Sequence, residues 1–130
     1  MSKEELMFHY WRKKLGLRDW TIRFQYNVEP EDMFIDDSCG CTTWQESGKT
    51  ALIQILKPER YGDRIAPFDI EKTIVHELLH LKLSFISSEC DNLQQRVAHQ
   101  IIDDLAKAFV DARRENKITK ETAAYEELND

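Results

Sequence analysis

Cysteine is scarce in this chain, and the arrangement of the few cysteines excludes two ways of stabilising a small domain. Cys39, Cys41 and Cys90 are the three cysteines among 130 residues. Three cysteines form neither the even-numbered framework of a disulfide-rich protein nor the paired spacing of a zinc knuckle. We therefore expect reduced thiols, and we assign Cys39 and Cys41 no role in binding or catalysis.

The sequence also lacks a basic patch and any long apolar run. Its 18 lysines and arginines are outnumbered by 24 aspartates and glutamates, which gives a formal net charge of -6. This balance argues against a general nucleic-acid binder. No run of about 18 apolar residues is present, and the first residues lack the apolar segment of a secretion signal. We expect a cytoplasmic protein without a membrane or nucleic-acid partner.

The length of 130 residues suits a single domain. The periodicity of the apolar residues predicts an N-terminal helix, a strand, a hairpin that turns at Gly48, and two long helices. We expect one α+β domain over residues 1–130, with a short, mostly antiparallel sheet of about three strands. The expected elements are helices 3–15, 67–86 and 92–114, strands 19–28, 39–45 and 50–57, and a polar, acidic tail 115–130 with one short helix.

Both long helices carry apolar residues at helical spacing, which we expect to face the core. In the first of them, Pro67 is expected in the first turn, with Asp69 and Glu71 near the positive end of the helix. The two stripes are Ile70, Ile74, Leu78, Leu81 and Phe85 in the first helix, and Leu93, Val97, Ile101, Leu105 and Phe109 in the second.

The strongest chemical signal is the sequence His-Glu-Leu-Leu-His at residues 76–80. Residues four apart on a helix lie about 40° from each other around the axis and about 6 Å along it, so His76 and His80 point the same way. Zinc accepts neutral histidine nitrogens, and catalytic zinc sites use three protein ligands and keep a fourth position for water. We therefore predict that His76 and His80 bind Zn²⁺.

Glu77 indicates that such a site is hydrolytic. It lies about 100° around the helix from His76, beside the ligands without being one. Water bound to zinc can have a pKa near 7, and a carboxylate in this position can accept its proton and later pass it to a leaving amine. We predict that Glu77 is the general base. The alternative is an ordinary helix with solvated or packed histidines.

A third ligand must come from outside this helix. The segment "QQRVAHQIID" offers His99 and Asp103, which are four residues apart and share one helix face. His99 is the preferred third ligand, because three neutral imidazoles leave a strongly Lewis-acidic ion, and Asp103 is expected to accept a hydrogen bond from behind the ligands. Asp103 itself, Glu89 and Asp91 are the rival third ligands.

In "HELLH" and "AHQIID" the chain resembles the zincin metallopeptidases, especially the gluzincins and the minigluzincins of bacteria and phages. The resemblance covers mainly residues 51–109. It implies that His99 replaces the glutamate ligand of gluzincins, as in the SprT-like branch, and that Asp103 is the aspartate that braces a ligand histidine. The metzincin signature is absent, since Leu83 and Ile86 occupy the positions of its glycine and third histidine.

The resemblance implies a zinc-dependent endopeptidase that acts on peptide or protein substrates. In zincins an edge strand above the motif helix pairs with the substrate backbone, and residues 39–45 or 50–57 are the candidates for that strand. Tyr61 and Tyr125 are candidate oxyanion donors. Two alternatives remain: a metal-stabilised regulatory or interaction module with weak or latent peptidase activity, and a zinc hydrolase with another substrate.

Overall fold

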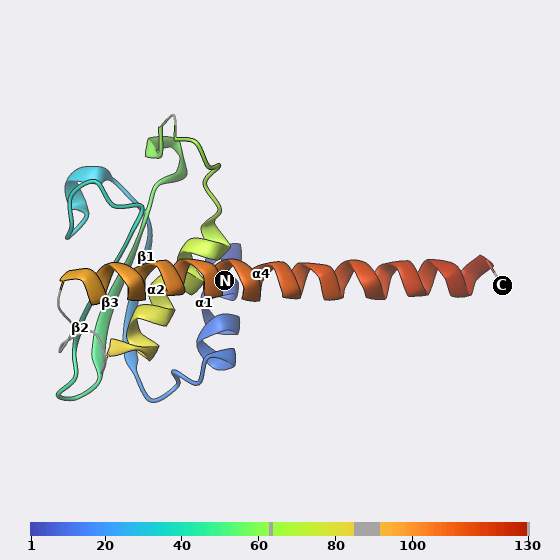
Figure 1. The fold of residues 1–130 in the computed structure, drawn as a ribbon, viewed down its shortest axis with the longest axis horizontal. Coiled ribbons are helices and arrows are strands. Elements are labelled where there is room, and N and C mark those ends of the chain that lie inside the picture. The colour runs from blue at the N-terminus through green and yellow to red at the C-terminus, as the bar shows by residue number, and fades with distance from the viewer. Residues whose placement is uncertain (63, 85–91, 130) are drawn as a thin grey trace.

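The structure is a computed structural model that describes residues 1–62, 64–84 and 92–129, with side chains described up to residue 116 (Figure 1). Among these residues the chain forms an α+β fold, as expected. The elements are α1 (Lys3–Lys14), β1 (Thr21–Val28), the 3₁₀ helix η1 (Pro30–Asp32), β2 (Gly40–Gln45), β3 (Thr50–Leu56), the 3₁₀ helix η2 (Pro58–Arg60), α2 (Ile70–Lys82) and α4 (Asn92–Asn129).

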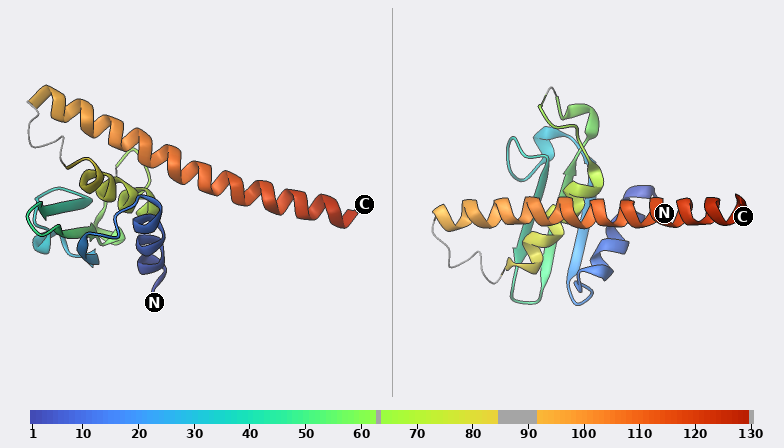
Figure 2. Two further views of the ribbon diagram at one scale, coloured as in Figure 1. Left: turned by 90° about the horizontal axis from the view of Figure 1, so that it is seen from below. Right: turned by 45° about the vertical axis from the view of Figure 1, so that its right-hand side comes forward.

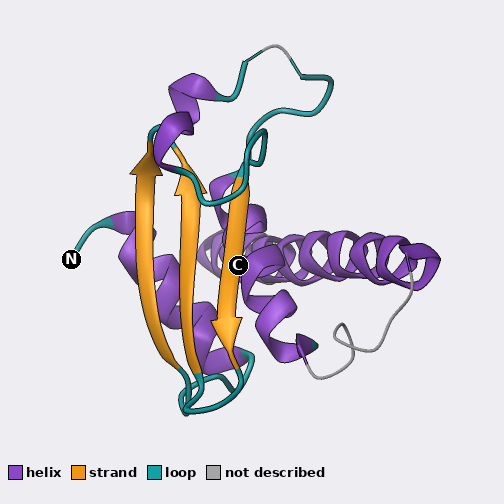
Figure 3. Ribbon diagram, turned by 90° about the vertical axis from the view of Figure 1, so that its left-hand side faces the viewer, coloured by secondary structure: helices purple, strands orange, loops and turns teal. Residues whose placement is uncertain are grey.

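The sheet has the strand order β1-β3-β2 (Figure 3). β3 is antiparallel to β2 but parallel to β1, so the expectation of a mostly antiparallel sheet is wrong and the sheet is mixed. The tight turn at Gly48, where φ is +83°, makes β2 and β3 antiparallel neighbours. β1 and β2 follow each other in the chain but are not neighbours in the sheet, because β3 lies between them. Ile53 and Ile55 of β3 are fully buried, as is typical of a central strand.

The helices lie in two layers beyond the sheet. α1 and α2 cover one face of the sheet, and α4 crosses α2 on the side away from the strands (Figure 2). The core lies between the sheet and the first helical layer, where Phe8 of α1 stacks on Phe24 of β1 at a centroid distance of 4.4 Å. Ile74, Leu78 and Leu81 of α2 are buried in this core, as their spacing predicts. Phe85 lies outside the described residues.

The start of α2 differs by one turn from the expectation. The helix begins at Ile70, and the side chain of Asp69 caps it by accepting a hydrogen bond from the backbone N–H of Lys72 at 3.2 Å. An aspartate in this position satisfies an amide that has no partner within the helix. Pro67 therefore lies before the helix and not in its first turn.

The predicted core-facing stripe of α4 is largely wrong, and of its five residues Leu105 packs against the core. Ile102, Ala106 and Val110 face the core, each at most 3% exposed, and they belong to the same buried cluster as Val75 and Leu79 of α2. The small side chain of Ala106 allows close approach of the two helices. The expected stripe is largely solvent-exposed: Leu93 65%, Val97 49%, Ile101 48% and Phe109 38%.

α4 is also longer than expected. The sequence predicts a helix over 92–114 and a separate polar tail, whereas the backbone is helical without a break to Asn129. Residues 111–129 contain neither proline nor glycine, so nothing in the sequence terminates the helix at residue 114. The C-terminal part of α4 extends beyond the rest of the fold (Figure 2). In the described part of the chain, no helix is both long and apolar enough to cross a membrane.

An ion-pair network around the buried Glu71 joins α4 to the start of α2. Glu71 is 4% exposed, and its carboxylate accepts hydrogen bonds from Arg113 at 2.6 and 2.8 Å and from the indole N–H of Trp11 at 2.8 Å. Arg114 forms two hydrogen bonds to Asp69, at 2.9 and 3.1 Å. Burial by itself raises the pKa of Glu71, but the hydrogen bonds from Arg113 and Trp11 hold it below the usual value. We call these five residues the α2–α4 clamp.

The clamp gives the first prediction. Arg113→Met keeps the aliphatic part of the side chain but removes the guanidinium group that donates two hydrogen bonds to the buried Glu71 carboxylate. We expect it to lower the free energy of unfolding by about 2 to 4 kcal/mol, because the buried Glu71 carboxylate is left with fewer partners. Urea unfolding measures this, with Lys107→Met on the exposed face of α4 as the matched control. Equal losses in the two variants would show that the clamp contributes little.

Candidate metal centre

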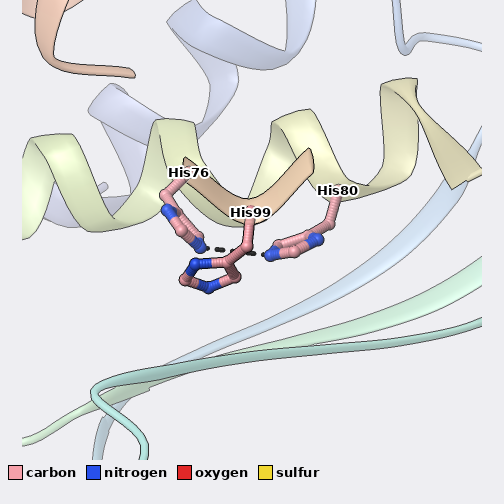
Figure 4. Close-up of side chains that lie close together, drawn as sticks. All are labelled: His76, His80 and His99. Carbon is pink, nitrogen blue, oxygen red and sulfur yellow. Dashed lines mark hydrogen bonds between the residues drawn. The ribbon is translucent and has the colours of Figure 1, made fainter. Parts of the chain in front are cut away.

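α2 places the two motif histidines on one face, as the spacing predicts. The Nε2 atoms of His76 and His80 are 3.1 Å apart, and both side chains are partly buried (Figure 4). The face opposite these rings carries Ile74 and Leu78, which are buried in the core. The apolar side of α2 thus fixes the rotation of the helix, and that rotation directs the two imidazoles toward α4.

α4 supplies His99. Its ring centroid lies 4.7 Å from that of His76 and 5.6 Å from that of His80, so the three rings surround one point (Figure 4). One nitrogen from each ring can be chosen so that the three lie within 4.8 Å of one another. Zinc–nitrogen bonds of about 2.0 to 2.1 Å in a tetrahedral site need nitrogens roughly 3.3 Å apart. His99 is the exposed ring of the three, so its rotation is the least restrained by packing.

Asp103 lies behind the cluster and not inside it. The Nδ1–H of His76 donates to its carboxylate at 2.6 Å, and the Nδ1 atom of His99 is 3.6 Å from the other carboxylate oxygen. A carboxylate at Nδ1 favours the tautomer of His76 that leaves the Nε2 lone pair free for a metal ion. The structure thus places Asp103 where a bracing residue is expected. The rival ligands Glu89 and Asp91 lie outside the described residues.

The pKa values of His76 and His80 suit metal binding. Burial, together with the neighbouring His76 and His99, lowers the pKa of His80 to about 4, although Asp103 opposes the shift. Burial also lowers the pKa of His76, although the nearby Asp103 carboxylate opposes the shift. Imidazole binds a metal only in its neutral form, so the lowered pKa values favour the ligand state at neutral pH. Three neutral imidazoles form a donor set that Zn²⁺ accepts well.

Glu77 lies beside the histidines, between α2 and β2. It is 5% exposed, and its Oε2 atom is 3.9 Å from Nε2 of His76. The hydroxyl of Thr42 donates to its Oε1 atom at 2.7 Å. Burial raises the pKa of Glu77 to about 7, although the hydrogen bond from Thr42 opposes the shift. Glu77 is therefore a carboxyl group that can exchange a proton near neutral pH while it lies next to a possible metal site.

Two residues at this site are missing from the sequence-based prediction. Thr42 bonds to Glu77, and a Cβ atom added to Gly40 would lie 2.7 Å from the Glu77 Oε2 atom. Only glycine therefore lets β2 approach the carboxylate this closely. An isolated glycine within a predicted strand is a known signal of close backbone approach and could have indicated this contact.

The remaining candidates are not members of the histidine cluster. The hydroxyl of Tyr61 donates to the backbone carbonyl of Ala66 at 2.9 Å, and the side chain of Tyr125 is beyond the described side chains. Cys39 and Cys41 are free thiols, and Cys41 packs with Val28 in a small apolar cluster on the sheet. Burial raises the pKa of both thiols, which keeps them protonated and unreactive. Cys90 lies outside the described residues.

Comparison of the chain with known protein families, curated protein sequences and solved structures finds no match. The geometry of the site therefore carries the functional argument.

The cluster gives the second prediction. His99→Ala should weaken Zn²⁺ binding by more than about 100-fold, because it removes a direct ligand, whereas Asp103→Asn should weaken it by about 10- to 100-fold. Competition with a chelating dye measures both affinities. His9→Ala is the matched control, because His9 is an exposed histidine on α1. If His99→Ala binds zinc as tightly as His9→Ala, His99 is not a ligand.

Proposed function

We propose that this protein is a zinc-dependent endopeptidase with His76, His80 and His99 as metal ligands and Glu77 as general base. The observation that carries the proposal is the convergence of three imidazoles from two helices next to a buried glutamate. A structural zinc site needs no such carboxylate, whereas hydrolysis needs a group that accepts and returns a proton. In this respect the arrangement is similar to that of the zincin metallopeptidases.

The histidines, Glu77 and Asp103 have different roles in the proposed reaction. His76, His80 and His99 would hold the zinc ion, which when bound would supply a Lewis acid for the scissile carbonyl and for the attacking water. Glu77 is placed to accept a proton from the attacking water, since its Oε2 atom faces the histidines. It can then give that proton to the leaving amine. Asp103 holds the His76 ring in one orientation through the 2.6 Å hydrogen bond.

β2 supports a peptide as the substrate. Within the described chain it pairs with β3 alone, so its other edge is unpaired there. The backbone carbonyl of Cys39 accepts from Leu56 N–H, and alternation along an antiparallel pair then directs the N–H and C=O groups of Gly40, Thr42 and Trp44 away from β3. An extended peptide can form a new strand on these groups beside Glu77. β3 is central, so residues 50–57 are not this edge.

A second function is supported by the origin of the ligands. His76 and His80 belong to α2 and His99 to α4, so a bound ion joins two helices that are separate in sequence. Metal binding would then fix α4, whose C-terminal part extends beyond the rest of the fold (Figure 2). This arrangement suits a metal-stabilised interaction module. The buried Glu77 has no function in such a module, which is why the peptidase is the preferred proposal.

The third prediction separates the two functions. Zinc-loaded wild-type protein should cleave members of a peptide library, and Glu77→Gln should lower the cleavage rate by about 10²- to 10⁴-fold because the proton acceptor is lost. The bound zinc should be retained. Mass spectrometry of the library and of the metal content measures both. Glu59→Gln, at an exposed glutamate of η2, is the control.

An unchanged rate in Glu77→Gln would contradict the assignment of the base. If the wild-type protein binds zinc tightly and gains thermal stability from it, yet cleaves no peptide, the interaction module becomes the better account.

A further inference from the structure

The two carboxylate oxygens of Glu77 have different surroundings. Oε1 accepts a hydrogen bond from the Thr42 hydroxyl at 2.7 Å, whereas Oε2 lies 3.9 Å from Nε2 of His76. The two oxygens of a carboxylate are chemically equivalent until the protein distinguishes them. Here one oxygen is held by β2 and the other is directed toward the histidine cluster.

The Thr42 hydroxyl has a choice of acceptors. It is 3.2 Å from the backbone carbonyl oxygen of Glu77 and 2.7 Å from the side-chain carboxylate. A hydroxyl has one proton to donate, and a hydrogen bond to an ionised carboxylate is shorter and stronger than one to a neutral carbonyl. The Thr42 hydroxyl therefore donates to the side-chain carboxylate, and this hydrogen bond restrains the side-chain torsions of Glu77.

Gly40 limits the same carboxylate from another direction. A Cβ atom on this residue would lie 2.7 Å from Glu77 Oε2 and 2.9 Å from the Thr73 methyl group. The backbone of β2 thus lies against the carboxylate where any other residue would displace it. Because side chains alternate along a strand, Gly40 and Thr42 face Glu77 together, while Thr43 faces the opposite side.

We propose that Thr42 is a positioning residue that holds Oε1 of Glu77 and so keeps Oε2 directed at the histidine cluster. This inference rests on the proposed peptidase function. It assigns β2 two tasks, because the strand that offers its backbone to a peptide also orients the general base. A purely structural role, in which Thr42 only satisfies a buried carboxylate, makes a different prediction: the variant would lose stability without a specific loss of turnover.

The kinetic experiment compares Thr42→Val, Thr42→Ser and Thr43→Val, each loaded with zinc, on one peptide that the wild-type protein cleaves. Valine keeps the shape and the strand propensity of threonine, so Thr42→Val isolates the hydroxyl. We expect kcat of Thr42→Val to fall by about 10- to 100-fold with KM within about twofold, as loss of a charge-assisted hydrogen bond predicts. Thr42→Ser should restore kcat to within about threefold, and Thr43→Val should match the wild-type protein.

A second readout does not depend on activity. Crystal structures of zinc-loaded wild-type protein, Thr42→Ser and Thr42→Val should show Oε2 of Glu77 directed at the metal in the first two and the carboxylate rotated away in the third. If the wild-type protein cleaves no peptide, the proposed function fails, but these structures still decide whether Thr42 positions Glu77. An unchanged Glu77 conformation in Thr42→Val, or a kcat equal to that of Thr43→Val, would overturn the inference.

Discussion

The crossing of α4 over α2 is the constraint on which the rest of the site depends. Two of the proposed ligands belong to α2 and one to α4, so the site exists only where the helices cross at the correct rotation. Packing of Ile102, Ala106 and Val110 holds the helices close, but apolar packing tolerates small rotations. The paired hydrogen bonds from Arg113 to Glu71 are directional and fix the rotation of α4. His99, on the same face of the helix, is thereby turned toward His76.

The sequence predicts local features of the fold well and long-range pairings less well. The hairpin around Gly48, the helix over the motif and the burial of Ile74 and Leu78 follow from periodicity and turn residues, which act over a few positions. The parallel pairing of β1 with β3 has no such local signal. α4 presents two apolar faces, and the sequence predicts the one with larger residues, such as Leu93 and Ile101, as the core face. In the structure the other face is buried, and in that rotation Arg113 reaches Glu71.

The same distinction applies to the site. The sequence predicts that His76 and His80 lie side by side, because residues four apart on a helix share one face. His99 and Asp103 share a face for the same reason. The structure brings all four side chains together across the two helices. Thr42 reaches Glu77 from 35 residues away, on a strand whose side chains show no chemical motif. Contacts of this kind depend on how α2 packs on the sheet, and the spacing of residues in the sequence does not determine that packing.

The central claim is that these helices form a zinc site with three imidazole ligands and one open position. X-ray absorption spectroscopy at the zinc edge of the purified, zinc-loaded protein tests it most directly. We predict about three imidazole nitrogens at roughly 2.0 to 2.1 Å and one further light-atom ligand from water. A spectrum with two imidazoles and two carboxylate oxygens, or a protein that takes up no zinc, would contradict the account.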